Sequence, residues 1–145
     1  METSVGISSA VLDQVLAAAA RSPTMEVCGL LFGDDAFIAA AIPCRNVAAD
    51  PTHAFEVDPA ALLAVHKAMR AGGPRLIGHY HSHPGGLPQP SPRDAAAANG
   101  GEYWLIIGGG QARLWRATAV GVWLERFVHV PVHPSAPCAP APASP

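Results

Sequence analysis

The sequence is poor in charged residues and cysteines, and it lacks a long apolar run. Only 14% of its 145 residues are charged and the formal net charge is −2, so the basic surface of a nucleic-acid-binding protein is missing. Its three cysteines include no Cys-x-x-Cys pair, which argues against a disulfide framework and a zinc ribbon. It has neither a run of about 18 apolar residues nor a secretory signal at the first residues. We therefore expect a cytoplasmic protein that binds neither nucleic acid nor membrane.

The apolar content is sufficient for a folded core. Half of the residues are apolar, and the mean hydropathy is +0.22, which excludes wholesale disorder for a chain of this length. The composition changes after Val130, because residues 131–145 hold six prolines and four alanines. These observations predict one folded domain over residues 1–130, followed by a flexible Pro/Ala-rich tail at 131–145 that joins no sheet.

Helical and strand patterns alternate along the domain. Apolar spacing, serine and aspartate caps, and glycine or proline stops predict three helices, over residues 9–21, 59–71 and 92–98. Short apolar runs bounded by turns predict six strands, over residues 27–32, 36–42, 75–81, 103–107, 112–117 and 122–130. A sheet flanked by helices, an α/β fold, is the natural architecture for this order.

The segment at residues 79–84, His-Tyr-His-Ser-His-Pro, contains the most informative chemistry. Residues two apart on a strand share a face, so His81 and His83 would present two imidazoles side by side where Pro84 ends the strand. The helix that opens near Ser91 could return the carboxylate of Asp94 to the same place. Two histidines and a carboxylate form a catalytic zinc ligand set that leaves one position for water. From spacing alone, an ordinary polar strand end is the alternative.

Three polar residues also have plain structural interpretations. The sequence Ser-Pro-Arg-Asp at 91–94 matches a helix capping box with proline at the first helical position. This pattern favours a structural role for Ser91, although a cap and a metal ligand can coexist in one helix start. Glu26 precedes an apolar strand, and such a lone glutamate is usually an ordinary solvated residue.

Taken together, these residues resemble a known family. The spacing His81-x-His83, seven residues, Ser91, two residues, Asp94 is that of the JAMM/MPN+ (Jab1/MPN/Mov34) metalloproteases, peptidase family M67. The segments 26–31, 43–46 and 55–59 are similar to small stand-alone bacterial members of that family. The likeness covers about residues 8–130.

The resemblance implies a fold and a set of roles. The fold would be a single MPN domain, with a mixed β-sheet flanked by α-helices in a cytidine-deaminase-like three-layer arrangement. His81, His83 and Asp94 would hold one zinc ion. Glu26 would be the general acid/base for a zinc-activated water, and Ser91 would stabilise the oxyanion.

The resemblance also implies a substrate class. Small bacterial relatives process ubiquitin-like sulfur-carrier proteins, so we expect hydrolysis of a peptide or isopeptide bond after a C-terminal Gly-Gly. The alternative is a non-catalytic MPN-type module that binds a ubiquitin-like or other protein partner. A nucleoside deaminase is disfavoured, because its His-x-Glu and Pro-Cys-x-x-Cys pattern is missing. The sequence leaves open the role of Cys28 and the oligomeric state, including a homo-oligomer.

Overall fold

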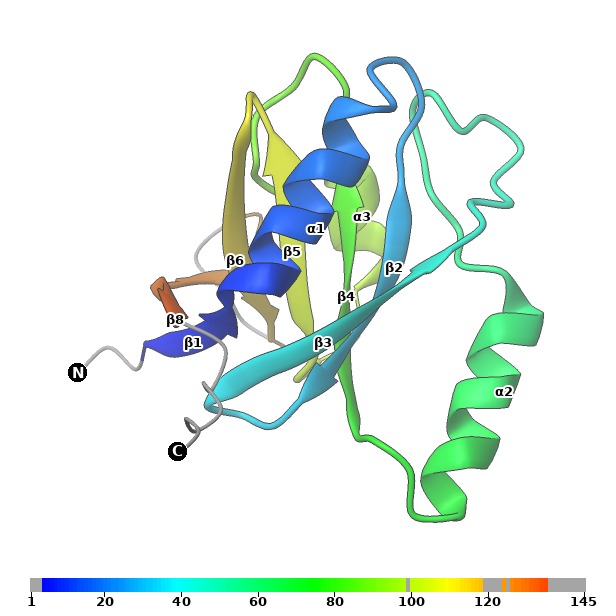
Figure 1. The fold of residues 1–145 in the computed structure, drawn as a ribbon. Coiled ribbons are helices and arrows are strands. Elements are labelled where there is room, and N and C mark those ends of the chain that lie inside the picture. Colours follow the sequence, from blue (N-terminus) through cyan, green and yellow to red (C-terminus); the bar gives the residue numbers. More distant parts are fainter. Residues whose placement is uncertain (1–3, 99, 119–123, 125, 136–145) are drawn as a thin grey trace.

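The computed structural model describes residues 4–98, 100–118, 124 and 126–135. An eight-stranded mixed sheet has the strand order β7-β6-β5-β4-β2-β3-β1-β8 (Figure 1). Its strands are β1 (Val5–Ser8), β2 (Cys28–Gly33), β3 (Phe37–Cys44), β4 (Leu76–Ser82), β5 (Tyr103–Gly108), β6 (Gln111–Ala117), β7 (Phe127–Val130) and β8 (Val132–Ser135). The helices are α1 (Ser9–Ala20), α2 (Pro59–Arg70) and α3 (Pro92–Ala97). None of these helices is long and apolar enough to cross a membrane.

Helix α1 packs on one face of the sheet (Figure 1). Its Val11 and Val15 are buried in one hydrophobic cluster with Leu31, Tyr80 and Leu105 from the central strands. Because side chains alternate along a strand, the neighbouring residues of β2 and β5 point to the opposite face. The opposite face of the sheet is therefore available for packing of the other two helices.

The opposite face carries two smaller hydrophobic clusters. Ala95 of α3 packs against the cluster that contains Trp104 and Ile106. Leu62 and Val65 of α2 pack against the cluster of Cys28, Leu30, Phe32 and Val57. The sheet is therefore the middle of three layers, and the predicted sheet flanked by helices is confirmed.

The central strand β4 positions the histidine segment. It pairs antiparallel with β2 and parallel with β5, and every residue after Leu76 is buried. Two parallel neighbours need a crossover connection, and here that connection contains α3. The crossover begins where β4 ends, which is where ligand sites form in sheets of this kind.

The three predicted helices and six predicted strands are all present, with shifted ends. The strand predicted over 122–130 begins at Phe127, and residues 119–123 and 125 lie outside the described residues. Strand β1 was not predicted, because its four residues are too few for a clear alternation. It is paired in parallel with both β3 and β8.

The prediction that residues 131–145 join no sheet is wrong for β8. Val132–Ser135 pairs with β1 over four residues, with Ile7 opposite Pro134. Proline is tolerated in an edge strand, because one side of that strand needs no partner. Residues 136–145 lie outside the described residues, so the flexible tail there and the domain boundary stay predictions.

Gly78 in β4 allows the close approach of β5, and its replacement tests this packing. A Cβ at Gly78 would clash with the backbone of Tyr103, its partner across the ladder. We expect Gly78→Ala to lower the free energy of unfolding by about 1–3 kcal/mol, measured by urea denaturation. Gly100→Ala is the control, because a Cβ there meets nothing within 4 Å. Equal unfolding midpoints for the two variants would contradict the packing described.

Candidate metal centre

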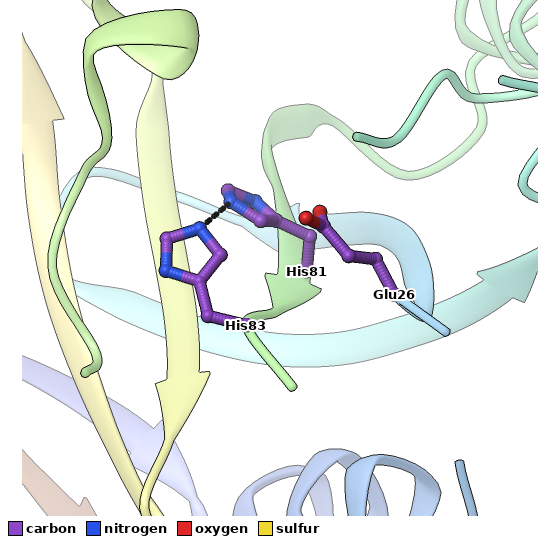
Figure 2. Close-up of side chains that lie close together, drawn as sticks. All are labelled: Glu26, His81 and His83. Carbon is purple, nitrogen blue, oxygen red and sulfur yellow. Dashed lines mark hydrogen bonds between the residues drawn. The ribbon is translucent and has the colours of Figure 1, made fainter. Parts of the chain in front are cut away.

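Four polar side chains meet at the end of β4. His81 lies near the end of β4, His83 follows the strand, and Asp94 lies in the first turn of α3. Glu26 precedes β2, and its carboxylate points toward both histidines (Figure 2). One ligand atom each from Glu26, His81 and His83 lies within 4.8 Å of the others. The fold therefore gathers groups that are 68 positions apart at the extremes, from 26 to 94.

The pairing of β2 with β4 explains the position of Glu26. Cys28 is opposite His81 in the antiparallel ladder. Continuing that register by two residues brings Glu26 opposite His83. Between these two pairs, Val27 and Ser82 form two hydrogen bonds. The Ser82 amide donates to the Val27 carbonyl at 3.0 Å, and the Val27 amide donates to Ser82 Oγ at 2.9 Å.

Three donor atoms form a close triangle. His81 Nε2 lies 3.1 Å from His83 Nε2, and Asp94 Oδ2 lies 3.3 Å from His81 Nε2 and 3.1 Å from His83 Nε2. A tetrahedral zinc ion with bonds of about 2.0–2.1 Å separates its ligand atoms by about 3.3 Å. The donor types and their spacing therefore fit a zinc ion.

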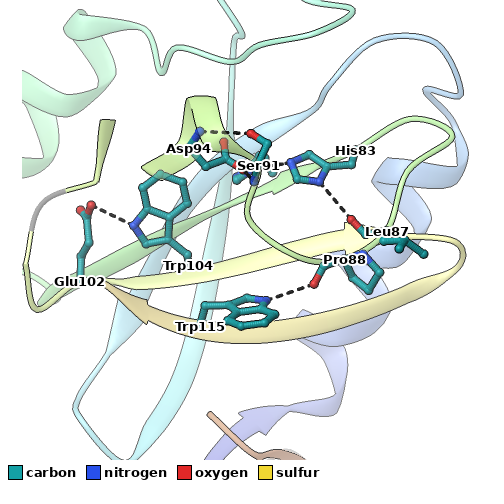
Figure 3. A network of polar contacts seen from close by, with 9 residues as sticks. His83, Leu87, Pro88, Ser91, Asp94, Glu102, Trp104 and Trp115 are labelled. Carbon is teal, nitrogen blue, oxygen red and sulfur yellow. Dashed lines mark hydrogen bonds and ion pairs between the residues drawn. The ribbon is translucent and has the colours of Figure 1, made fainter. Parts of the chain in front are cut away.

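A capping box holds Asp94 in this triangle (Figure 3). The Asp94 amide donates to Ser91 Oγ at 3.1 Å, and the Ser91 amide donates to Asp94 Oδ2 at 2.9 Å. The predicted capping box is thus confirmed. The oxygen used by the cap is also the one that faces His81 and His83, so the cap and the site share one carboxylate.

His83 is oriented by the loop that follows it. Its Nδ1 lies 3.0 Å from the carbonyl oxygen of Leu87 and donates to it. Burial opposes the charge of the His83 ring, but the contact of Nε2 with the Asp94 carboxylate outweighs this and raises the pKa of His83. The next residue of the loop is also anchored, because Trp115 Nε1 donates to the Pro88 carbonyl at 3.1 Å (Figure 3). The loop therefore fixes the orientation of the His83 ring.

His81 is fully buried, with 0% of its surface exposed. The ring of Phe55 stacks on its imidazole with the centroids 4.1 Å apart and the planes at 18°. Burial lowers the pKa of His81 despite the neighbouring Asp94 carboxylate, so the imidazole is neutral at pH 7. Neutral imidazole is the form that binds metal.

The charge of Asp94 complements the neutral imidazole of His81. Burial opposes its ionisation, but its contacts with His81 and His83 outweigh this and hold the pKa of Asp94 well below its usual range. His81 and Asp94 therefore offer a neutral nitrogen and an ionised oxygen. This is the combination that a catalytic zinc site uses.

Glu26 is buried, with 8% of its surface exposed, so the alternative of a solvated glutamate is wrong. Burial raises the pKa of Glu26 to about 7, while His83 lowers it and Asp94 raises it further. A carboxyl group with a pKa near neutrality can both accept and donate a proton. Glu26 thus has the environment of an acid/base group.

Two further rings, those of His79 and Phe55, lie beside His81. His79 packs against Phe55 and Trp104, with ring centroids 4.9 Å and 4.3 Å away. Burial lowers the pKa of His79 to about 3, so it is an aromatic core residue on the face of His81. Phe55 approaches His81 from a loop 26 positions earlier in the sequence, and only the likeness of segment 55–59 to the family pointed to it.

Comparison with known proteins agrees with this geometry. The family model described as prokaryotic homologs of the JAB domain matches residues 8–118. The chain belongs to this family. The predicted membership of the JAMM/MPN+ proteins, in their small prokaryotic form, is therefore confirmed.

Two relatives and one solved structure are similar to this JAB-domain chain. It is 40% identical over 99 residues to the desampylase of Haloferax volcanii, covering 67% of this chain and 71% of that protein. It is 43% identical over 67 residues to a probable TtuB-protein conjugate cleaving protease of Thermus thermophilus, covering 46% of this chain and 45% of that protein. A JAB1/MPN domain protein of Archaeoglobus fulgidus shares the fold, with 20% identity, a TM-score of 0.57, and coverage of 90% and 99%. The predicted MPN fold is therefore confirmed.

The burial of Glu26 gives the metal-free protein a distinctive pH dependence. The folded state raises the pKa of Glu26 from 4.5 to about 7, so it binds the proton more tightly than the unfolded chain. Stability from this group is therefore full below pH 4.5 and is lost as the pH rises toward 7. We expect the Tm of chelator-treated Glu26→Gln to fall less between pH 5 and 8 than that of the wild type.

Differential scanning calorimetry of both proteins measures this difference. Glu56→Gln is the matched control, because the same substitution is made at an exposed glutamate, and its Tm should follow that of the wild type. Identical Tm profiles for wild type and Glu26→Gln would show that the Glu26 carboxyl is not desolvated.

Proposed function

We propose that this protein is a zinc-dependent isopeptidase or peptidase that cleaves after the C-terminal Gly-Gly of a ubiquitin-like, sulfur-carrier type protein. The observation that supports it most is the triangle of His81, His83 and Asp94 with the buried carboxyl of Glu26 beside it. The two relatives, a desampylase and a probable TtuB-protein conjugate cleaving protease, support the same substrate class.

In this proposal, the triangle holds the metal. His81 and His83 would contribute their Nε2 atoms and Asp94 its Oδ2 atom. A zinc ion bound there supplies a Lewis acid that activates water and polarises the scissile carbonyl. The orientation of His83 by Leu87 and of Asp94 by its cap would keep the donors in place before the ion binds.

Glu26 would move the protons. Its carboxylate accepts a proton from the attacking water and donates that proton to the leaving amine when the C–N bond breaks. The raised pKa of Glu26, about 7, suits both directions of transfer near neutral pH. Its place beside both histidines would put it next to a water held by the metal.

Ser91 would stabilise the charge that develops on the carbonyl oxygen. Its Oγ accepts from the Asp94 amide at 3.1 Å, and the hydroxyl still has a proton to donate. A single donor to an oxyanion can be worth about 10²–10³ in rate. The capping role and the proposed catalytic role use different parts of the same hydroxyl.

The surroundings of the centre suit an extended substrate tail. A cavity of about 420 Å³ borders Glu26 and Tyr80, and a second of about 370 Å³ borders Asp94 and Trp104. Glycines let an extended backbone approach such a centre closely. The proposal places the enzyme in the cytoplasm, where the free thiols of Cys28 and Cys44 stay reduced.

Intact-mass analysis tests the reaction and its substrate class. A carrier protein extended beyond its Gly-Gly is incubated with the zinc-loaded protein, with and without a chelator. We expect zinc-dependent loss of the residues after Gly-Gly. An isopeptide-linked conjugate should likewise be cleaved after Gly-Gly only when zinc is present. Binding of the carrier without cleavage of either substrate, at full zinc occupancy, would indicate the non-catalytic binding module instead.

Substitutions at Glu26 and at His81 should distinguish loss of turnover from loss of metal binding. Glu26→Gln should retain one zinc ion per chain and lose about 10²–10⁴-fold in rate, because only proton transfer is removed. His81→Ala should lose the zinc itself, because one donor of three is removed. Zinc content is measured by elemental mass spectrometry and the rate by intact mass.

His66→Ala is the matched control, because His66 is an exposed histidine on α2. It should keep both zinc and rate. A Glu26→Gln variant with zinc bound and an unchanged rate would refute the proposed mechanism.

A further inference from the structure

The segment between β3 and α2, residues 45–58, lies beside the metal centre and has little regular structure. Its pairing as a strand is limited to an isolated bridge between Asn46 and Val57. Side-chain hydrogen bonds must therefore contribute much of its order. Asn46, near the start of the segment, makes four side-chain hydrogen bonds, of which three lie within the segment and one reaches Glu26.

The side-chain amide of Asn46 uses its full bonding capacity. Its Nδ2 donates to the carbonyls of Glu26 and Ala54, each at 3.0 Å. Its Oδ1 accepts from the amides of Ala48 and Glu56, also each at 3.0 Å. An asparagine amide has two donor hydrogens and two acceptor lone pairs, so all four are satisfied.

Glu26 depends on this segment for its position. It precedes β2, which begins at Cys28, so the sheet ladder does not hold its backbone. The Glu26 amide donates to the Pro51 carbonyl at 2.7 Å, and the Glu26 carbonyl accepts from Asn46. Both backbone groups of Glu26 are thus bonded to the segment 45–58.

The side-chain amide of Asn46 also binds the residues on both sides of Phe55. Ala54 is bonded through its carbonyl and Glu56 through its amide, and the ring of Phe55 between them stacks on His81 at 4.1 Å. One side chain therefore connects the backbone of Glu26 to the ring that covers His81.

We propose that Asn46 is a positioning residue for hydrolysis, because its amide fixes Glu26 and Phe55 relative to one another and so sets the acid/base carboxyl against His81. This inference rests on the proposed function. Asn46 acts through Glu26 and Phe55 and takes no part in proton transfer. A general base must lie within about 2.6–3.2 Å of the heavy atom whose proton it abstracts, and a misplacement of about 1 Å can cost about 10²-fold in rate.

Asn46→Asp tests the inference, because it keeps the shape and the acceptor but removes both donor hydrogens. We expect kcat to fall about 100-fold, while KM and the content of one zinc per chain stay unchanged. Gln14→Glu is the matched control. Gln14 on α1 donates its side-chain amide to the Ala41 carbonyl at 3.1 Å, so the same amide-to-acid change is made away from Glu26. Its kcat should equal that of the wild type.

Hydrogen exchange provides a readout that does not need activity. In Asn46→Asp the Glu26 amide should exchange faster, while the amides of β4 keep their protection. A purely structural role would lower the Tm but leave kcat per folded molecule unchanged. Should Asn46→Asp fail to fold, Asn46→Ala removes the same donors without burying a charge, and the same results are expected.

The outcomes separate this inference from the proposed function. A wild-type protein that binds zinc but cleaves no Gly-Gly substrate overturns the proposed function, and the inference with it. A wild-type protein that cleaves, with Asn46→Asp or Asn46→Ala cleaving at the same kcat, overturns the inference alone. Unchanged exchange of the Glu26 amide in these variants overturns it as well.

Discussion

The close approach of two imidazole nitrogens and one carboxylate oxygen, all within 3.3 Å, is the constraint on which the site depends. Lone pairs that face one another repel unless a cation or a shared proton lies between them. The protein nevertheless holds them together by contacts from outside the triangle. Leu87 orients one ring, Phe55 covers the other, and the Ser91 cap aims the carboxylate. Such prearranged donors are what the proposed metal site requires.

The topology of the sheet explains why these groups meet. The β4 strand ends at Ser82, and the crossover to its parallel neighbour β5 must begin there. That crossover carries Asp94 back to the strand end on α3. The antiparallel neighbour β2 supplies Glu26 from the other side, by continuation of the same register. His81 and His83 thus come from the end of β4, Asp94 from its connection to β5, and the proposed acid/base group Glu26 from the residues before β2.

Local sequence patterns predict the histidine segment, the capping box and most of the secondary structure, because each depends on residues that are close in the sequence. The spacing of His81, His83 and Asp94 also carried the family likeness. Local patterns could not locate Glu26, because a glutamate before a strand looks the same whether solvated or buried. Phe55 and Asn46 act through contacts across the fold. Strand β8 was missed because Pro134 argues against a strand unless that strand lies at a sheet edge.

Zinc K-edge X-ray absorption of the zinc-loaded protein tests the proposed centre most directly. The predicted spectrum shows nitrogen and oxygen ligands only, at about 2.0–2.1 Å, including the multiple scattering of two imidazoles. His83→Ala should reduce the imidazole contribution to one ring. A zinc–sulfur distance of about 2.3 Å, or two imidazoles still bound in His83→Ala, would show that the metal lies elsewhere and contradict the centre described.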